Sequence, residues 1–414
     1  MSKYSSSKAV FWVIGLALVM VLPAKVFAQP LVSIDTVLVG DAGNPAATGL
    51  NALSWGSNYG YGSVAYEFQI GKTEVTINQY AVFLNAVATV PSQSFQTNLW
   101  NSNMQTNLNI AGISRSGAGI LGDPYSYSVL GSGARPITYV GFYESAAFVN
   151  WLSNGATANS GILTGAYKIS TGDVTQVSRS ANLSTLTSVG HTLSVGDEVT
   201  ISGVSGFDGS YFVSAVTANT FSFAQNGRDQ GATASDGRLT GASATRDPNA
   251  TWWIPSEDEW VKAAYFDPTL NAGAGGYTSH ANQSDNIAAN ILGTAGGANY
   301  RDEVFAVTQS DAYSSIQNYL TDAGAYPDTL SYYGTLDQAG NVLEWNESFV
   351  LDSWRGLRSG AWDLGEIGMG AASRGFGDPT AESPTIGFRV ASIPEPSTLI
   401  VVLFGGAIFF PRRR

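Results

Sequence analysis

The sequence predicts one large domain of short strands and helices on a compact scaffold, with much irregular loop and one additional strand-rich segment. Three observations lead to this fold class. The chain has 414 residues, enough for one large domain plus an insertion. Aromatic residues make up 12% of it, which is too many for a disordered chain. It also contains 47 glycines and few long helical patterns, so irregular connections should link the regular elements.

The first part of the chain predicts two strands and a helix. Residues 31–39 alternate and are rich in β-branched side chains, which predicts a strand, and residues 66–70 predict a second one. Between them, residues 40–62 form a loop rich in glycine and asparagine. A helix should follow, because Thr76 and Gln79 make a capping-box pattern. Its buried face is predicted by the helical spacing of Tyr80, Phe83, Leu84 and Val87.

Two more helices have recognisable starts. One is predicted at about 143–152, although Gly141 stands where a serine would make a better N-cap. The other begins after Ser256, which forms a second capping box with Glu259. Residues 91–134 show no periodic pattern that favours a helix or a strand.

Residues 171–238 have a different residue pattern from the segments on either side of them. They contain short β-type runs separated by glycines, which is typical of a small β-barrel or sandwich module inserted into a surface loop. Chains tolerate such insertions where the two ends of the insert lie close together. The predicted strands are 193–195, 198–201, 211–216 and 220–223.

Both ends of the chain carry processing signals. Two lysines, an apolar run and small residues predict a secretory signal peptide over 1–28, with cleavage after Ala28. Residues 393–414 contain Pro-Glu-Pro, an apolar run of twelve residues and three arginines. This arrangement resembles the PEP-CTERM sorting signal of Gram-negative bacteria, which an exosortase reads. The apolar run is short of the roughly 20 residues that a membrane-spanning helix needs.

The net charge of the chain disfavours two classes of partner. The net charge is −12, and the chain is still more acidic without the basic residues at its ends, which disfavours nucleic acid and anionic lipid as partners. There is no cysteine, so an exported form has no disulfide and depends on its core, and on a bound metal if one is present.

Residues 332–347, YYGTLDQAGNVLEWNE, concentrate oxygen ligands, aromatic rings and glycines. The carboxylates of Asp337 and Glu344 and the carbonyls of Gly340 and Val342 converge on one point if Gly340 allows a sharp turn. Such oxygens are the ligands of hard cations, calcium above all. The alternative is a tight turn into a buried strand, in which the two carboxylates only cap backbone amides.

The Gly-Asn-Val-Leu-Glu-Trp motif at 340–345 resembles the signature of the formylglycine-generating enzyme (sulfatase-modifying factor) family. Further blocks similar to that family are the strand–Glu-Val-Thr–helix unit at 68–87, Trp-Ile-Pro-Ser-Glu-Asp-Glu-Trp at 253–260, and residues 357–362 and 386–390. The resemblance implies a C-type-lectin-like α+β fold with much irregular loop. It assigns 29–170 and 239–392 to a discontinuous family domain and leaves 171–238 as a small inserted all-β module.

The resemblance also implies two calcium sites. A structural calcium ion would be held by Asp337, Gly340, Val342 and Glu344. A second would use the Asn299 side chain and the Tyr300 carbonyl, with Asn290 as a competing candidate.

The family's defining enzyme oxidises a substrate cysteine with O₂ and a copper ion held by two cysteines, which would fall at 363–368. This chain has none. A related branch binds iron through three histidines, but only His191 and His280 exist, and both are expected in solvated loops. We therefore expect no copper or iron.

We expect structural roles for several acidic residues. Glu257, Asp258 and Glu259 cluster at a helix start, where the helix dipole favours anions, so they should cap the helix rather than catalyse. Glu344 should form a buried ion pair with Arg374 or Arg389.

These observations favour a non-catalytic binding or structural protein on the cell surface or in the extracellular matrix of a Gram-negative bacterium. Its partners would be the exosortase, during transient membrane association of the C-terminal segment, and an extracellular polysaccharide or surface protein. Trp362, Trp354 and Arg374 would form the ligand face, with Trp55, Tyr59 and Tyr61 as other candidates for stacking on sugars. The alternatives are a family enzyme with non-cysteine chemistry, and a carrier whose working part is the insertion.

Overall fold

The computed structural model describes residues 29–47, 60–92, 94–287 and 289–394. The predicted signal peptide, most of the C-terminal sorting signal, Trp55 and Tyr59 lie outside these residues. None of the described residues belongs to a helix that is both long and apolar enough to cross a bilayer.

A four-stranded antiparallel sheet joins the two ends of the described chain. Its strands are β1 (Thr36–Val39), β2 (Phe68–Gly71), β21 (Ala391–Ser392) and β12 (Trp252–Trp253), paired in that order. Both predicted N-terminal strands are therefore present, but each is shorter than its β-type pattern.

A second four-stranded sheet carries the central motif. It has the order β19 (Gly375–Gly377), β18 (Arg355–Arg358), β17 (Leu343–Phe349) and β20 (Ile386–Phe388). Strands β17 and β20 run parallel, with Leu343 opposite Ile386, and the other pairs are antiparallel. The motif thus lies in the interior of the fold, and Trp345 is fully buried.

Three helices pack against these sheets, and all three were predicted. They are α1 (Ile77–Val87), α4 (Phe142–Ser153) and α5 (Glu257–Tyr265). Both predicted capping boxes are formed, with Thr76 and Gln79 at α1 and Ser256 and Glu259 at α5. Between α1 and α4 the rings of Phe83 and Trp151 lie 5.4 Å apart, so the apolar faces of the two helices meet in one aromatic core.

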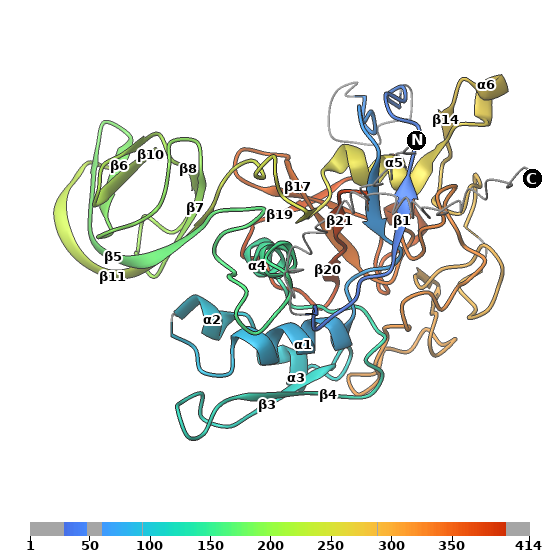
Figure 1. Ribbon diagram of the computed structural model, residues 1–414, viewed down its shortest axis with the longest axis horizontal. Helices are drawn as coiled ribbons and strands as arrows, with labels where there is room; N and C mark the ends of the chain where they lie inside the picture. Colours follow the sequence, from blue (N-terminus) through green and yellow to red (C-terminus); the bar gives the residue numbers. More distant parts are fainter. Residues whose placement is uncertain (1–28, 48–59, 93, 288, 395–414) are drawn as a thin grey trace, which may run out of the picture.

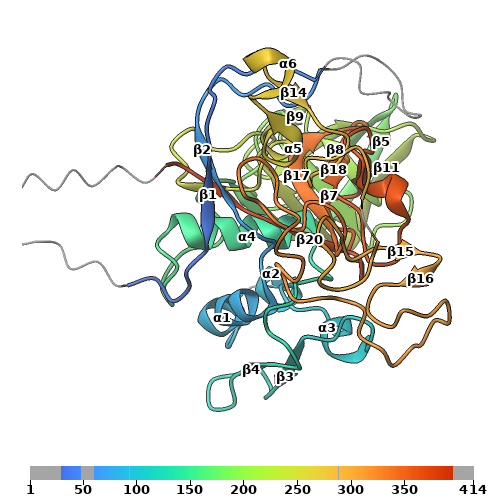
Figure 2. The same ribbon diagram turned by 90° about the vertical axis from the view of Figure 1, so that its right-hand side faces the viewer.

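Short elements and loops make up the rest of the domain. Residues 91–134, which showed no periodic pattern, contain two short helices and a hairpin: α2 (Ser94–Asn98), α3 (Asn103–Thr106), β3 (Ile113–Ser116) and β4 (Ser126–Val129). The long stretch between β14 and β17 wraps one side of the molecule (orange in Figure 2). Three short elements precede this stretch: β13 (Phe266–Asp267), α6 (Leu270–Gly273) and β14 (Gly276–Tyr277). The stretch itself contains β15 (Arg301–Asp302) and β16 (Val304–Phe305). The 3₁₀ helix η1 (Glu366–Met369) follows later in the chain.

Residues 169–242 form a curled seven-stranded antiparallel sheet at one end of the molecule (Figure 1). Its order is β8 (Gly209–Phe212), β7 (Glu198–Ser202), β11 (Gln230–Ala242), β5 (Ile169–Ser180), β6 (Leu183–Thr187), β10 (Thr220–Ala224) and β9 (Ala215–Val216). The sheet has its own hydrophobic cluster. Because Ile169 pairs with Ala242, the segment enters and leaves at adjacent points.

The strand predictions inside this segment were partly wrong. Residues 193–195 form no strand, although Leu193 is buried, and 211–216 is split between β8 and β9. The two longest strands, β5 and β11, were missed. Their outward positions hold serine, threonine, glycine and aspartate, so neither shows a dense run of β-branched residues.

Candidate functional site

The two predicted cation segments lie against each other in the interior. Gly340 has a positive φ of 98°, and a Cβ there would stand 2.4 Å from the carbonyl oxygen of Asn299, so only glycine fits this crossing. The backbone amide of Asn341 donates to that same carbonyl at 2.8 Å. Asp337 also has a positive φ, and its carboxylate accepts a hydrogen bond from the amide of Gly324.

Glu344 is held in a fully buried ion pair with Arg389. The Nε and Nη2 atoms of Arg389 lie 2.5 and 2.6 Å from the two carboxylate oxygens, and the indole of Trp260 donates to one of them at 2.7 Å. Arg389 also donates to the carbonyls of Gly71 and Leu336. Of the two predicted partners, Arg389 therefore pairs with Glu344.

Glu74 is a buried carboxyl group that the sequence interpretation gave no role. It is 1% exposed, and neither of its oxygens has a hydrogen-bond partner among the described residues. Burial, followed by repulsion from Asp337 and Glu344, raises its pKa well above the usual value. Burial is also the largest cause that raises the pKa of Asp337 to about 6. The signal in the sequence was only a glutamate between the β2 strand and the first helix cap.

These groups fit a calcium ion in part. Glu74 has no hydrogen-bond partner among the described residues, and Asp337 is close enough to raise the pKa of Glu74 by repulsion, so two carboxyl groups are available to a cation. Glu344 does not face a cation in this arrangement, because Arg389 and Trp260 occupy its oxygens. Within the described parts of the chain, no group of three or more Asp, Glu, His or Cys side chains is arranged to hold a metal.

In the predicted second cation site, the asparagine side chain hydrogen-bonds to the backbone of another segment. The buried amide of Asn299 donates to the carbonyl of Tyr319 and to Asn341, both at 3.0 Å. Asn290, the competing candidate, donates to the Tyr300 carbonyl at 2.9 Å. Each candidate amide thus donates to the backbone of a neighbouring segment and stabilises a loop.

The predicted ligand face is divided between the core and the surface. Trp362 is only 5% exposed and stacks on Tyr319 with ring centroids 4.9 Å apart, so little of it is left for a ligand. Trp354 is 41% exposed. Arg374 forms an ion pair with Glu257 at 2.6 Å, and its guanidinium lies over the ring of Tyr61.

The acidic residues at the start of α5 are held by ion pairs and hydrogen bonds, and of the three only Glu259 closes the capping box. Glu257 pairs with Arg358 as well as Arg374, and Glu259 pairs with Arg246 while closing the capping box. Asp258 accepts a hydrogen bond from the amide of Gly62 at 2.8 Å.

The segment in which family cysteines would fall, 363–368, forms a turn at the surface. It leads into η1, where Ile367 is 81% exposed. His280 lies beside this turn, with its Nε2 atom 4.0 Å from a carboxylate oxygen of Glu366. His191 contacts the Thr220 carbonyl at 3.0 Å in the seven-stranded sheet. Both histidines are partly buried rather than solvated, and they lie in different parts of the fold.

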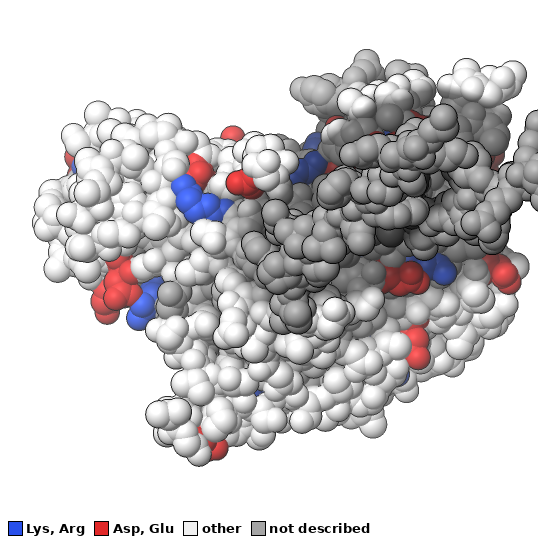
Figure 3. Space-filling model, in the orientation of Figure 1, with Lys and Arg blue, Asp and Glu red and all other residues white. Residues whose placement is uncertain are grey.

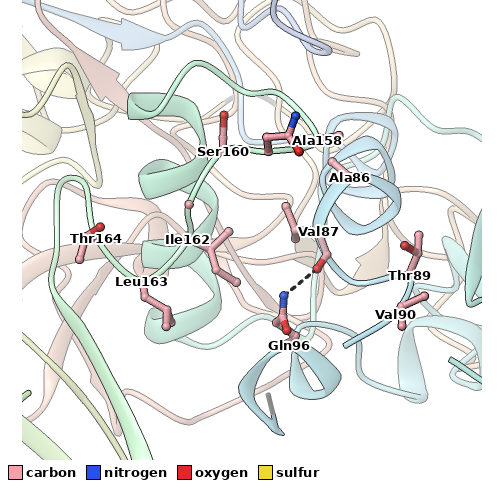
Figure 4. Close-up of a pocket in the computed structure, with 12 residues that line it drawn as sticks. Ala86, Val87, Thr89, Val90, Gln96, Ala158, Ser160, Ile162, Leu163 and Thr164 are labelled. Carbon is pink, nitrogen blue, oxygen red and sulfur yellow. Dashed lines mark hydrogen bonds between the residues drawn. The ribbon is translucent and has the colours of Figure 1, made fainter. Parts of the chain in front are cut away.

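One surface hollow of about 440 Å³ lies between the end of α1, α2 and residues 158–164 (Figure 4). Its lining is small apolar side chains, hydroxyls and amides, and Gln96 closes one side by donating to the Val87 carbonyl at 3.0 Å. None of the described residues that line it is ionisable, so it provides no acid, base or metal ligand.

A protein-family comparison matches most of the chain. Residues 62–393 match the family described as "Sulfatase-modifying factor enzyme 1-like domain". No curated protein shows significant sequence similarity to the chain.

Similar solved structures include Treponema denticola variable protein 1 (16% identity, covering 89% of this chain and 98% of that one, TM-score 0.41). CarF is 17% identical, covers 88% of this chain and 99% of its own, and has a TM-score of 0.41. PvdO from Pseudomonas aeruginosa is 14% identical, covers 87% of this chain and 94% of its own, and has a TM-score of 0.40. These likenesses are too distant to assign an activity. The sequence match covers most of the chain, and the chain therefore belongs to the sulfatase-modifying factor enzyme 1-like family.

Proposed function

We propose that this protein is an exported binding or structural protein of the cell surface or extracellular matrix, which uses the family scaffold without formylglycine chemistry. One observation carries the proposal: a chain of 414 residues contains no cysteine. The copper ion of the family's defining enzyme is held by two cysteine thiolates, and this chain supplies no thiolate.

The buried acidic residues support a scaffold role. Glu257, Glu259 and Glu344 are all paired with arginines and hydrogen-bonded to helix starts or strands. Such paired carboxylates stabilise one conformation and are not poised to move a proton to a substrate.

The export part rests on the sequence of the two ends. A signal peptide over 1–28 and an exosortase-read signal over 393–414 would deliver the chain through the inner membrane of a Gram-negative bacterium, with transient membrane association before processing. Mass spectrometry of the exported chain should find Gln29 at its N-terminus. A chain that keeps residues 1–28 in the cytoplasm would contradict export.

The proposal includes an inserted module and a structural calcium ion. The seven-stranded sheet has its own hydrophobic cluster and adjacent points of entry and exit, which supports an insertion over about 171–238 into the domain of 29–170 and 239–392. Calcium would be held by Asp337 with the carbonyls of Gly340 and Val342, joined by Glu74. The Asn299–Tyr300 segment stays a second, weaker candidate.

The test is binding of the exported chain to extracellular polysaccharide purified from the producing bacterium, with calcium and with a chelator. Dextran serves as the control polysaccharide. We expect retention on the native polysaccharide alone. Absence of retention in both conditions would overturn the proposed function.

Metal analysis of the same preparation tests the alternative of a redox enzyme. We expect calcium and neither copper nor iron. Stoichiometric copper or iron would favour an enzyme with non-cysteine ligands.

A further inference from the structure

A cleft of about 390 Å³ lies where the family domain meets the seven-stranded sheet. One side is formed by the end of α2 and the residues after it, and the opposite side by strands β7 and β11. The start of α4 and residues 380–382 complete it. The cleft therefore depends on both parts of the molecule, and neither part forms it alone.

Glu144 is a buried and incompletely partnered group in this cleft. It is 8% exposed, and its Oε2 atom has no hydrogen-bond partner among the described residues. Burial, followed by repulsion from Glu382, raises its pKa to about 8, although the backbone amides of Glu144 and Gly141 act against this. Glu144 is thus mainly a neutral carboxylic acid at pH 7, able to donate and to accept a hydrogen bond. A buried polar atom without a partner is uncommon in folded proteins, and a ligand group would satisfy it.

The other polar groups of the cleft are held in place by a hydrogen-bonded chain. The hydroxyls of Tyr143 and Thr200 lie 3.0 Å apart, and Thr200 is 2.7 Å from Ser210, which donates to Asp378 at 2.6 Å. On the other side, Asn101 donates to the exposed carboxylate of Glu382 at 2.7 Å. These bonds orient hydroxyl and carboxyl groups before any ligand arrives, which lowers the entropic cost of binding.

An aromatic ring is also held in position at the cleft. Arg115 lies over the ring of Trp100 at 4.0 Å, and the indole N–H donates to the Ile113 carbonyl. A ring fixed in this way loses little freedom when a ligand packs against it.

Charge narrows the class of ligand. None of the described residues lining the cleft is lysine or arginine, so the lining itself offers no cation to a phosphate or sulfate group. The face of the molecule in Figure 3 carries few charged side chains among its described residues. The lining instead combines hydroxyls, amides, aromatic rings and two acidic side chains, Glu144 and Glu382, which match a ligand with many hydroxyl groups and apolar C–H faces.

We infer that this cleft binds a short stretch of saccharide units within a neutral polysaccharide, with Glu144 hydrogen-bonded to a sugar hydroxyl and Trp100 packed against a sugar ring. The inference rests on the proposed function and deepens it, because it names the site and the class of ligand. It also gives the seven-stranded sheet a role as one wall of the binding site.

The test uses a variant that fills the cleft from an exposed position. Ser202 lies at the exposed end of β7 and lines the cleft, so Ser202→Trp should block it without disturbing a core. The matched control is Gln176→Trp, which places the same ring at an exposed position of β5 in the same sheet, outside the cleft lining. Glu144→Gln keeps the size of the buried side chain and removes the acid.

The probe is a set of oligosaccharides made by partial hydrolysis of the extracellular polysaccharide of the producing bacterium. Binding to the exported chain is measured by calorimetry at pH 7, with circular dichroism and melting temperature as checks of folding. We expect Ser202→Trp to weaken binding at least tenfold, Glu144→Gln to weaken it several-fold, and Gln176→Trp to bind as the parent does.

The outcomes separate this inference from the proposed function. If the parent binds and Ser202→Trp binds equally well, the cleft is not the site, while the proposed function stands. Equal losses in Ser202→Trp and Gln176→Trp would place the site elsewhere on the sheet and also overturn the inference. If the parent binds no saccharide, the proposed function itself fails.

Discussion

At the scale of single residues, the interior contains ionisable groups in two different conditions. Glu344 and Arg389 are fully buried and neutralise each other through two hydrogen bonds. Glu74 and Glu144 are buried with oxygens that no described residue satisfies. Removal of one member of the first pair should be strongly destabilising because it leaves a buried unpaired charge, whereas the unpartnered acids should oppose folding once they ionise.

Replacement of Glu344 separates the ion pair from the calcium proposal. Glu344→Ala leaves Arg389 buried and unpaired, which should lower the free energy of unfolding by about 3–5 kcal/mol. We expect the same loss in calcium and in chelator, measured by denaturant unfolding. Asp337→Ala is the comparison, because its loss should be larger in calcium than in chelator if the ion is bound there. A Glu344→Ala variant as stable as the parent in chelator would contradict the role of the pair.

Glu144 predicts a pH dependence of stability. Its folded pKa of about 8 exceeds the usual value of 4.5, so the folded protein holds a proton that the unfolded chain releases. The free energy of unfolding should therefore fall as pH rises from about 5 to 8, by at most about 1.4 kcal/mol per pH unit.

Glu144→Gln should remove this slope, and the variant should gain on the parent as pH rises. Urea unfolding of both proteins at pH 5, 6.5 and 8 measures it. A constant difference between them over that range would show that Glu144 titrates normally.

At the scale of elements, the helix starts obey local rules in two cases and depart from them in the third. Helices α1 and α5 have complete capping boxes, but α4 begins at Gly141, whose missing side chain caps nothing. The structure explains this choice. A Cβ at Gly141 would lie 2.6 Å from the Glu144 carboxylate and 2.8 Å from the Pro379 carbonyl. Crowding at the edge of the cleft therefore outweighs capping.

Loss of the cap at α1 should have an ordinary cost. Thr76→Ala removes the side-chain acceptor for the amide of Gln79 and should destabilise the protein by about 1 kcal/mol. Thr76→Ser keeps the acceptor and serves as the control. Equal stability of the alanine variant and the parent would mean that tertiary packing alone holds the start of α1.

Gly141→Ser should do the opposite of what helix capping predicts. Serine is a favoured N-cap, yet its Cβ has no room beside the Pro379 carbonyl, so the melting temperature should fall. Gly231→Ser is the control, because a side chain there meets open space. An increase in melting temperature for Gly141→Ser would show that the chain relaxes at no cost.

At the scale of the whole molecule, the seven-stranded sheet is joined to the rest of the chain by a buried ion pair. Arg355 on β18 lies 2.9 Å from Glu198 on β7, and both side chains are fully buried. The guanidinium is also stacked between the rings of Phe142 and Phe349. Because Thr200 on β7 lines the cleft near this junction, the pair should hold the two walls of the cleft in a fixed relation.

Arg355→Ala should loosen this junction by about 3–5 kcal/mol, because Glu198 would remain buried without its partner. Limited proteolysis should then cut between the sheet and the domain faster than in the parent. Arg238→Ala removes an exposed pair with Asp173 and should change stability by less than about 1 kcal/mol. Similar effects of both substitutions would mean that burial adds nothing to the junction.

Local patterns in the sequence determined much of this protein. The spacing and type of the residues predicted the capping boxes of α1 and α5 and the α4 helix, because each depends on neighbours within about four positions. The motif at 340–345 likewise indicated the family. The absence of cysteine likewise needs no structure.

Only the tertiary structure decided which distant groups meet. It chose Arg389 as the partner of Glu344, buried Trp362 against Tyr319, left Glu74 and Glu144 with unsatisfied oxygens, and paired the long strands β5 and β11. The physical reason is that burial and charge pairing depend on chain segments up to a few hundred residues apart, and no local pattern encodes that proximity.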